Sequence, residues 1–260
     1  MRYLTFGLIW LMRFMLGASL FSFAGVIICR LPRGEGIIRG RSRCITCGKV
    51  LGPAELVPCL SYLIQRGRCR NCGGKIPVRD FWLEVLGGLC AWAVVLRWGG
   101  ETIQSCLALC VLFLLTIVAF IDYDTMEIYD RFHLLFLLCG VISMRVFPET
   151  GLLSRLTGCT MLSALMLIIA LLIPNGFGGG DIKLAFSLGF LMGWRGILCT
   201  AVLSVSIAGF WSIWMLAGKR IDRKTQLAFS PFFCTGAAAS FFYGNEITDW
   251  WLKLTFPWCP

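Results

Sequence analysis

Two groups of acidic residues stand at the edges of apolar stretches, far apart in the sequence. The first follows the run TIVAFI and reads DYDTMEIYD, with Asp122, Asp124, Glu127 and Asp130. The second is Asp181, which follows three consecutive glycines and leads into the run IKLAF. Two carboxyl groups held close together cannot both ionise, so one keeps a proton at neutral pH. The ionised carboxylate can then take a proton from water while its partner protonates a carbonyl, which is aspartic-protease chemistry.

This chemistry needs no serine, cysteine or metal, and a single histidine, His133, excludes most histidine-based mechanisms as the main machinery. The glycines at 178–180 support a site at Asp181. They let another backbone approach closely, and they leave non-helical backbone that must line a cavity or be buried in protein. The alternative is that these acids are ordinary loop residues at a membrane surface. It suits Asp122 and Asp181 least, because ionisable groups at the edge of membrane spans tend to be functional.

Four of the 14 cysteines form two CxxC pairs, CITC at 44–47 and CRNC at 69–72, and each pair is followed by glycine. Four thiolates at Cys44, Cys47, Cys69 and Cys72 predict a tetrahedral structural Zn²⁺ site, which would supply folding energy to a short segment. The alternatives are two redox pairs or unrelated cysteines, but there is no βαβ pattern to support a thioredoxin-like role. The other ten cysteines are interpreted as small packing residues.

The chain around these residues has the composition of a membrane protein. It is 58% hydrophobic with a mean hydropathy of +0.79, well above a soluble domain. The sequence therefore predicts an all-α polytopic integral membrane protein with about eight transmembrane helices. The apolar runs lie at 4–29, 81–98, 103–121, 132–147, 152–173, 182–194, 197–217 and 227–243, and only Trp194–Gly196 divides the sixth from the seventh.

Charge predicts the orientation of these helices. Residues 30–80 hold 11 of the 24 Lys and Arg residues against three acids, and basic loops stay in the cytoplasm. Nucleic-acid binding is the other interpretation of a basic block, but a loop tethered between two membrane helices favours orientation, so no nucleic-acid partner is expected. Counting crossings then places Asp122, Asp181 and a second basic turn near 218–226 on the cytoplasmic side. The predicted domains are a first transmembrane helix (1–29), a basic cytoplasmic zinc-binding loop with four cysteine ligands (30–80) and a membrane aspartyl protease core (81–260).

Several motifs together carry a family resemblance. They are CRLP (29–32), ELVPCLSYLIQRGRC (55–69), FIDYDTMEIYD (120–130), GGGDIKLAFSLG (178–189) and AFSPFF (228–233), besides the two CxxC pairs. The chain resembles the type IV prepilin peptidases nearly end to end. The resemblance implies an eight-helix GxGD-type aspartyl protease in the bacterial inner membrane, with its active site facing the cytoplasm. It also implies cleavage of the basic leader of type IV prepilins or pseudopilins after a glycine and, in many members, N-methylation of the new terminus with S-adenosylmethionine.

Carried over by position, the resemblance makes Asp122 and Asp181 the catalytic pair, with Asp124 and Asp130 as supporting acids and Cys44, Cys47, Cys69 and Cys72 as the cysteine tetrad. No glycine-rich Rossmann motif shows where S-adenosylmethionine would bind, so Gly67 and Glu84 are only candidate positions. Two departures concern fine specificity. Tyr129 stands where the family usually has proline before the last acid, and FSPF (229–232) stands where it usually has PFGP.

Two other functions use the same residues. A proton- or cation-coupled transporter would use the carboxylates and glycine-broken helices, but it predicts acids near the bilayer midplane. A membrane thiol oxidoreductase would use the CxxC pairs, but a cytoplasmic placement of these cysteines argues against it. Membrane lipid is an expected partner of a chain this apolar. The sequence does not indicate the substrate, the pilus, secretion or competence system served, or the oligomeric state.

Overall fold

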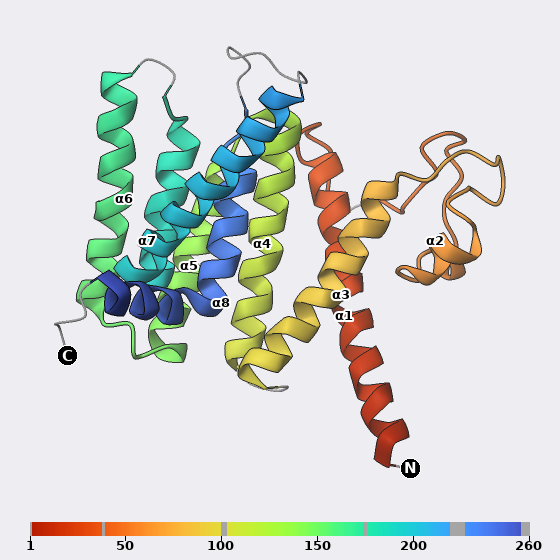
Figure 1. Ribbon diagram of the computed structural model, residues 1–260. Coiled ribbons are helices and arrows are strands. Elements are labelled where there is room, and N and C mark those ends of the chain that lie inside the picture. The colour runs from red at the N-terminus through yellow and green to blue at the C-terminus, as the bar shows by residue number, and fades with distance from the viewer. Residues whose placement is uncertain (1, 38–39, 100–102, 174–175, 219–226, 256–260) are drawn as a thin grey trace. The chain divides into compact units, whose positions relative to one another are not determined.

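The computed structural model describes residues 2–37, 40–99, 103–173, 176–218 and 227–255. Within these ranges the regular structure is helical, with only two isolated β-bridges and no strand. The helices, in chain order, are α1 (Arg2–Arg30), the short 3-10 helix η1 (Pro53–Glu55), α2 (Leu60–Ile64), α3 (Val78–Trp98), α4 (Ile103–Thr125), α5 (Asp130–Val146), α6 (Leu152–Leu172), α7 (Gly179–Ala217) and α8 (Ser230–Thr255) (Figure 1).

Five of these helices, α1 from Thr5 onward, α3, α4, α6 and α7, are long and apolar enough to cross a membrane. The prediction of an all-helical polytopic membrane protein is therefore confirmed at this level. The predicted apolar runs coincide with helices whose ends differ by a few residues, and the last helix continues well past residue 243. The basic turn predicted near 218–226 falls mostly outside the described residues.

Helix α7 has 39 residues, which corresponds to about 58 Å, nearly twice the hydrocarbon core of a bilayer. Gly193, with φ 77° and ψ 177°, interrupts it, and Figure 1 shows that both ends of α7 lie at the same side of the helix cluster. The predicted division at Trp194–Gly196 was slightly misplaced. The chain turns at Gly193 because its left-handed backbone is open to glycine at little cost.

The expectation that the three glycines before Asp181 are non-helical was only partly right. Gly178 is extended and precedes the helix, whereas Gly179 and Gly180 already belong to α7. Gly180 does provide close approach, because a Cβ there would lie 3.1 Å from the Cβ of Ile128 in the segment after α4. Glycine here brings the start of α7 against the turn that follows Asp122.

The chain divides into two compact units, unit 1 (residues 1–109) and unit 2 (110–260). In unit 1, α1 and α3 pack at Gly17 and Gly87, where an added Cβ would overlap the backbone of the facing helix. In unit 2, α6 and α7 meet in the same way at Gly158 and Gly189. Such small-residue contacts let membrane helices approach closely without a hydrophobic driving force.

One buried arginine forms hydrogen bonds with several helix ends of unit 2. Arg155, in the first turn of α6, is 1% exposed. Its guanidinium donates to the Ser143 hydroxyl and to backbone carbonyls at 2.8–3.2 Å, those of Thr150, Ser143, Phe147, Phe190 and Leu191. These carbonyls lie at the end of α5, in the turn after it, and just before the break in α7. The sequence analysis did not predict this cluster.

Candidate active site and cysteine cluster

Asp122 lies one turn before the end of α4 and is 7% exposed. The apolar residues before it, which fill α4, place its carboxylate at the boundary between the buried helix and the turn at 126–129. One oxygen, Oδ2, accepts a hydrogen bond from the backbone N–H of Ser230 at 3.2 Å. This N–H belongs to the first turn of α8, where backbone N–H groups have no partner within the helix.

Asp181 lies in the first turn of α7 and is half-buried. Its Oδ1 accepts a hydrogen bond from the hydroxyl of Ser230 at 2.7 Å. The partial positive charge of a helix N-terminus stabilises an ionised carboxylate at this position. The structure thus brings Asp122 and Asp181 to the same residue, Ser230, from two helices that are distant in sequence.

Ser230 is fully buried and bonds to both acids, through its N–H and its hydroxyl. The sequence analysis missed it and noted its surroundings only as a departure from the family pattern. In the sequence, Ser230 stands between Phe229 and Pro231 at the start of an apolar run. A polar residue at such a point, between apolar neighbours, was the available clue.

Aromatic side chains lie beside this pair of acids. Phe177 precedes the α7 glycines, Phe229 precedes Ser230, and their rings meet edge to face at 5.4 Å between centroids. Phe229 also packs against Phe233 in α8. These rings place apolar surface next to the carboxylates, and excluding water strengthens the electrostatic interactions within such a site.

The predicted supporting acids, Asp124 and Asp130, are exposed, unlike the two acids that bond to Ser230. Asp124 lies near the end of α4. Asp130 begins α5 and forms an exposed ion pair with Lys183 of α7 at 2.7 Å, and this ammonium lowers the pKa of Asp130 below its ordinary value. The structure therefore directs Asp130 toward Lys183, whereas Asp122 and Asp181 are directed toward Ser230.

The four predicted cysteines form one cluster in unit 1. The Sγ atoms of Cys44, Cys47, Cys69 and Cys72 all lie within 4.8 Å of one another, and those of Cys44 and Cys72 are 3.8 Å apart. Tetrahedral Zn–S bonds of about 2.3 Å place sulfurs about 3.8 Å apart, so the donor set fits a zinc ion.

The two CxxC pairs have the same local backbone. In each, the N–H of the first cysteine bonds to a carbonyl five residues on, and the glycine after the second cysteine, Gly48 or Gly73, has φ near +70°. This turn brings both sulfurs of a pair into the cluster. The N–H groups of Cys47 and Thr46 lower the pKa of the Cys44 thiol to about 6, which favours the thiolate that a metal requires.

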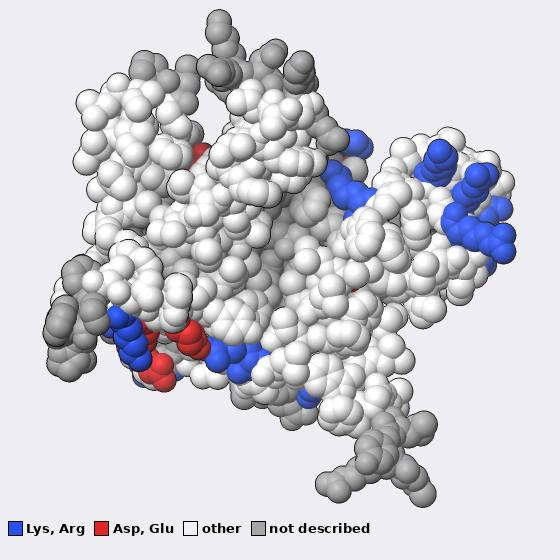
Figure 2. All heavy atoms as spheres, in the orientation of Figure 1, with Lys and Arg blue, Asp and Glu red and all other residues white. Residues whose placement is uncertain are grey.

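The segment carrying this cluster is strongly basic at its surface. Figure 2 shows Lys and Arg side chains gathered over the part of unit 1 that contains α2. The exposed basic residues include Arg43, Lys49, Arg68, Arg70 and Lys75, which flank the two cysteine turns. The charge that predicted the orientation of this segment is therefore displayed to solvent.

The two candidate cofactor positions are both engaged with the protein itself. Glu84 of α3 accepts hydrogen bonds from the Ser22 hydroxyl at 2.8 Å and from the Cys59 N–H at 2.6 Å. Gly67 has φ +67°, and an added Cβ would lie 2.8 Å from the hydroxyl oxygen of Tyr62. These contacts fix the cysteine segment on α1 and α3.

Comparison with known proteins covers nearly the whole chain. Residues 15–98 match the bacterial peptidase A24 N-terminal domain, and residues 109–213 match the type IV leader peptidase family. A prepilin leader peptidase/N-methyltransferase of Bacillus subtilis is 30% identical over 93% of this chain and 97% of its own length. Proteins of the same name from Myxococcus xanthus and Aeromonas hydrophila are 33% and 28% identical over 82% and 96% of this chain, and over 65% and 94% of their own lengths. No solved structure gives a significant match.

Proposed function

Because the chain belongs to the type IV leader peptidase family, we propose that it is a membrane aspartic endopeptidase that removes the leader of a type IV prepilin and N-methylates the new terminus. The relatives that match it from end to end carry both activities in their names. They do not favour a transporter or a thiol oxidoreductase. The observation that carries the site assignment is the bridge that Ser230 makes between Asp122 and Asp181.

In the proposed reaction, one of the two aspartates is ionised and the other holds a proton. The ionised carboxylate takes a proton from a water molecule, whose oxygen bonds to the carbonyl carbon of the scissile peptide. The partner gives its proton to the carbonyl oxygen. The tetrahedral intermediate then collapses and the C–N bond breaks. The leaving nitrogen takes up the proton that the first carboxylate had accepted, and one hydroxyl of the intermediate returns its proton to the partner carboxylate as the C=O bond reforms. Ser230 keeps the two carboxyl groups in position throughout.

We place eight membrane crossings in the chain, namely α1, α3, α4, α5, α6, the two parts of α7 and α8. The length of α7 and its break at Gly193 support two crossings there. Within unit 2, the end of α4 and the starts of α7 and α8 lie at the same side (Figure 1). We assign this side to the cytoplasm of a bacterial inner-membrane protein, because basic loops stay inside and counting crossings from the basic 30–80 segment to the end of α4 gives the same side.

In this arrangement residues 1–29 are the first crossing, residues 30–80 the cytoplasmic cysteine segment and residues 81–260 the protease core. Cys44, Cys47, Cys69 and Cys72 would hold a structural Zn²⁺ that stabilises the segment. One equivalent of zinc in the purified protein, lost in a Cys44→Ser variant, is the expected finding, and a chain purified free of zinc with full stability would contradict it. The substrates are prepilins or pseudopilins. S-adenosylmethionine would supply the methyl group. Gly67 and Glu84 have no role in the proposed methyl transfer.

The test is cleavage of a prepilin by protein reconstituted in lipid vesicles. Asp122→Asn and Asp181→Asn should each reduce leader removal by at least about 1,000-fold, because neither amide can exchange the proton. Asp249→Asn is the matched control, since Asp249 pairs with Arg195 in an exposed ion pair unconnected to Ser230. Wild-type cleavage by both aspartate variants, at equal protein levels, would overturn the assignment.

A further inference from the structure

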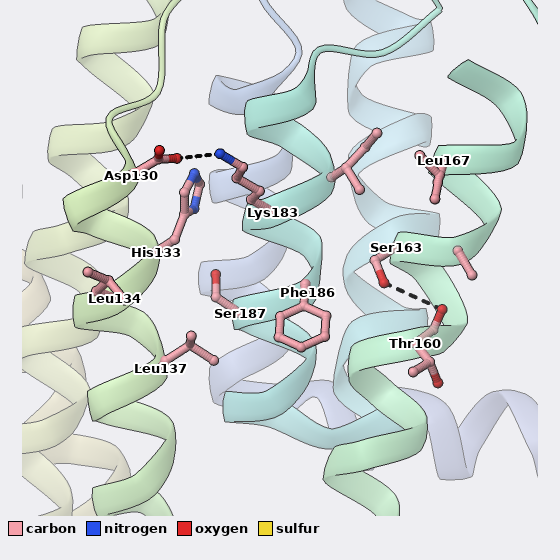
Figure 3. Close-up of a pocket in the computed structure, with 12 residues that line it drawn as sticks. Asp130, His133, Leu134, Leu137, Thr160, Ser163, Leu167, Lys183, Phe186 and Ser187 are labelled. Atoms are coloured by element: carbon pink, nitrogen blue, oxygen red, sulfur yellow. Dashed lines mark hydrogen bonds and ion pairs between the residues drawn. The ribbon is translucent and has the colours of Figure 1, made fainter. Parts of the chain in front are cut away.

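Helices α5, α6 and α7 enclose a cavity of about 580 Å³ that the catalytic assignment does not use. Figure 3 shows α7 between the other two helices, with side chains of all three directed into the space. We name this cavity the α5–α6–α7 slot. Its volume lies within the range of ligand pockets, about 300–1,000 Å³.

The slot is apolar along most of its length and open at the protein surface. Leu134 of α5, Leu167 of α6 and Phe186 of α7 line it, and each is between 43% and 68% exposed. Because α6 and α7 are candidate membrane spans, such an opening would face the hydrocarbon of the bilayer. An occupant must therefore be largely apolar and able to enter from the membrane.

One polar side chain inside the slot is unsatisfied. His133 is 6% exposed, and both of its ring nitrogens are buried without a hydrogen-bond partner among the described residues. Its ring lies next to the ion pair of Asp130 and Lys183 at one end of the slot (Figure 3). Buried polar groups without partners are rare and costly, and ionisable residues within membrane proteins are functional by default.

The slot also adjoins the two aspartates through α7. Ile182 and Lys183 line it, and they directly follow Asp181 in the helix. Successive helical residues point in directions about 100° apart, so Asp181 can face Ser230 while the next two residues face the slot. A chain that occupies the slot would pass within a helical turn of Asp181.

We propose that the α5–α6–α7 slot binds an apolar segment of the prepilin substrate next to the scissile bond, in non-helical conformation, with His133 bonded to its backbone. This inference rests on the proposed function. A peptide unwound for cleavage exposes N–H and C=O groups that hydrocarbon cannot satisfy. A neutral imidazole offers one donor and one acceptor, which is what one peptide N–H and one C=O require. A lipid ester offers acceptors only and would leave one ring nitrogen unpaired, so the peptide fits better.

The first test separates binding from folding at His133. His133→Leu removes both hydrogen-bonding atoms, and it should raise the KM for a prepilin about tenfold while kcat changes little. Thermal stability should be unchanged or higher, because an unsatisfied buried group is gone. His133→Gln keeps one donor and one acceptor and should stay within about threefold of wild type. An unchanged KM in His133→Leu, or a loss of stability in both variants, would overturn the proposal.

The second test does not depend on cleavage. A photoreactive benzoylphenylalanine replaces Leu137 inside the slot or, as the control, the exposed Val205 in the second part of α7. In vesicles of phosphatidylethanolamine and phosphatidylglycerol with added prepilin, we expect the probe at 137 to capture prepilin and the probe at 205 to capture lipid. Capture of lipid or of a second copy of this chain at 137, without prepilin, would overturn the inference. If the proposed protease function failed, this cross-link would still report whether prepilin occupies the slot.

Discussion

Two buried polar clusters of unit 2 lie at opposite ends of the same helices and differ in how completely their hydrogen bonds are made. At the end of α5, Arg155 directs its guanidinium donors to a hydroxyl and five backbone carbonyls. At the opposite end of these helices, His133 at the start of α5 has two buried nitrogens without partners among the described residues, and two acids, at the end of α4 and the start of α7, meet at a single serine. A completed network rigidifies its surroundings, whereas unsatisfied groups retain capacity for a ligand.

The difference indicates where stability and chemistry reside. The Arg155 cluster holds the break in α7 and the end of α5 in one arrangement, so it fixes the frame within which Asp181 is positioned. The acids, by contrast, make few bonds, as the proposed exchange of protons between them requires. Substitutions at the first cluster should therefore change folding, and those at the second should change activity.

The largest effect on stability is expected at Arg155. Arg155→Ala leaves several carbonyls without donors in a water-poor interior, and it should cost about 3–5 kcal/mol of unfolding free energy. Arg155→Lys should recover only part of this, because an ammonium lacks the planar fork that reaches carbonyls on two helices. Thermal unfolding in detergent measures both variants.

The control for this experiment is Arg145→Ala, which removes an exposed arginine near the same end of α5 and should melt close to wild type. If Arg155→Ala also melted like wild type while prepilin cleavage fell, the comparison would fail. The Arg155 cluster would then contribute to activity rather than to the stability of the fold.

At Ser230 we expect a smaller effect, and one on activity rather than on stability. Ser230→Gly removes the hydroxyl that bonds to Asp181 but keeps the N–H that bonds to Asp122, so kcat should fall about tenfold with stability nearly unchanged. Ser240→Ala is the matched control. It removes another buried hydroxyl of α8, which donates to the Gly196 carbonyl at 2.7 Å, and it should lower stability without changing kcat. A loss in Ser230→Gly as large as in Asp181→Asn would show that the hydroxyl takes part in the chemistry.

The parts of the site that could be predicted from sequence are those with a local pattern. Each CxxC pair and the glycine after it determine a turn, and the two turns together bring four sulfurs into one cluster. The acids were evident because a carboxylate at the end of an apolar run has few structural roles. Their cytoplasmic placement stays a prediction that depends on counting crossings.

Ser230 and Arg155 could not be found in this way. Each is a single polar residue whose partners come from helices distant in sequence, so neither spacing nor periodicity marks it. The division of α7 was misplaced for a related reason. Several glycines occur near it, and only packing distinguishes the one that leaves the helix, because a Cβ at Gly193 would overlap Ser154 of α6 and Thr150 in the turn before it.

The smallest effect is expected for the ion pair of Asp130 and Lys183, which tests whether a well-formed polar contact stabilises the fold as strongly when it is exposed as the Arg155 cluster does when buried. The pair is well formed, but its side chains are 74% and 58% exposed. Because Lys183 lowers the pKa of Asp130, the pair stabilises the fold above the ordinary carboxylate range and loses this contribution as pH falls through the lowered value. Asp130→Asn should therefore melt at most about 2 °C below wild type at pH 7, and the two curves should converge as the pH falls below the lowered pKa of Asp130. A difference comparable to that of Arg155→Ala, or one that grows as the pH falls, would mean that solvent does not screen this pair, and that burial is not what makes the Arg155 cluster important for stability.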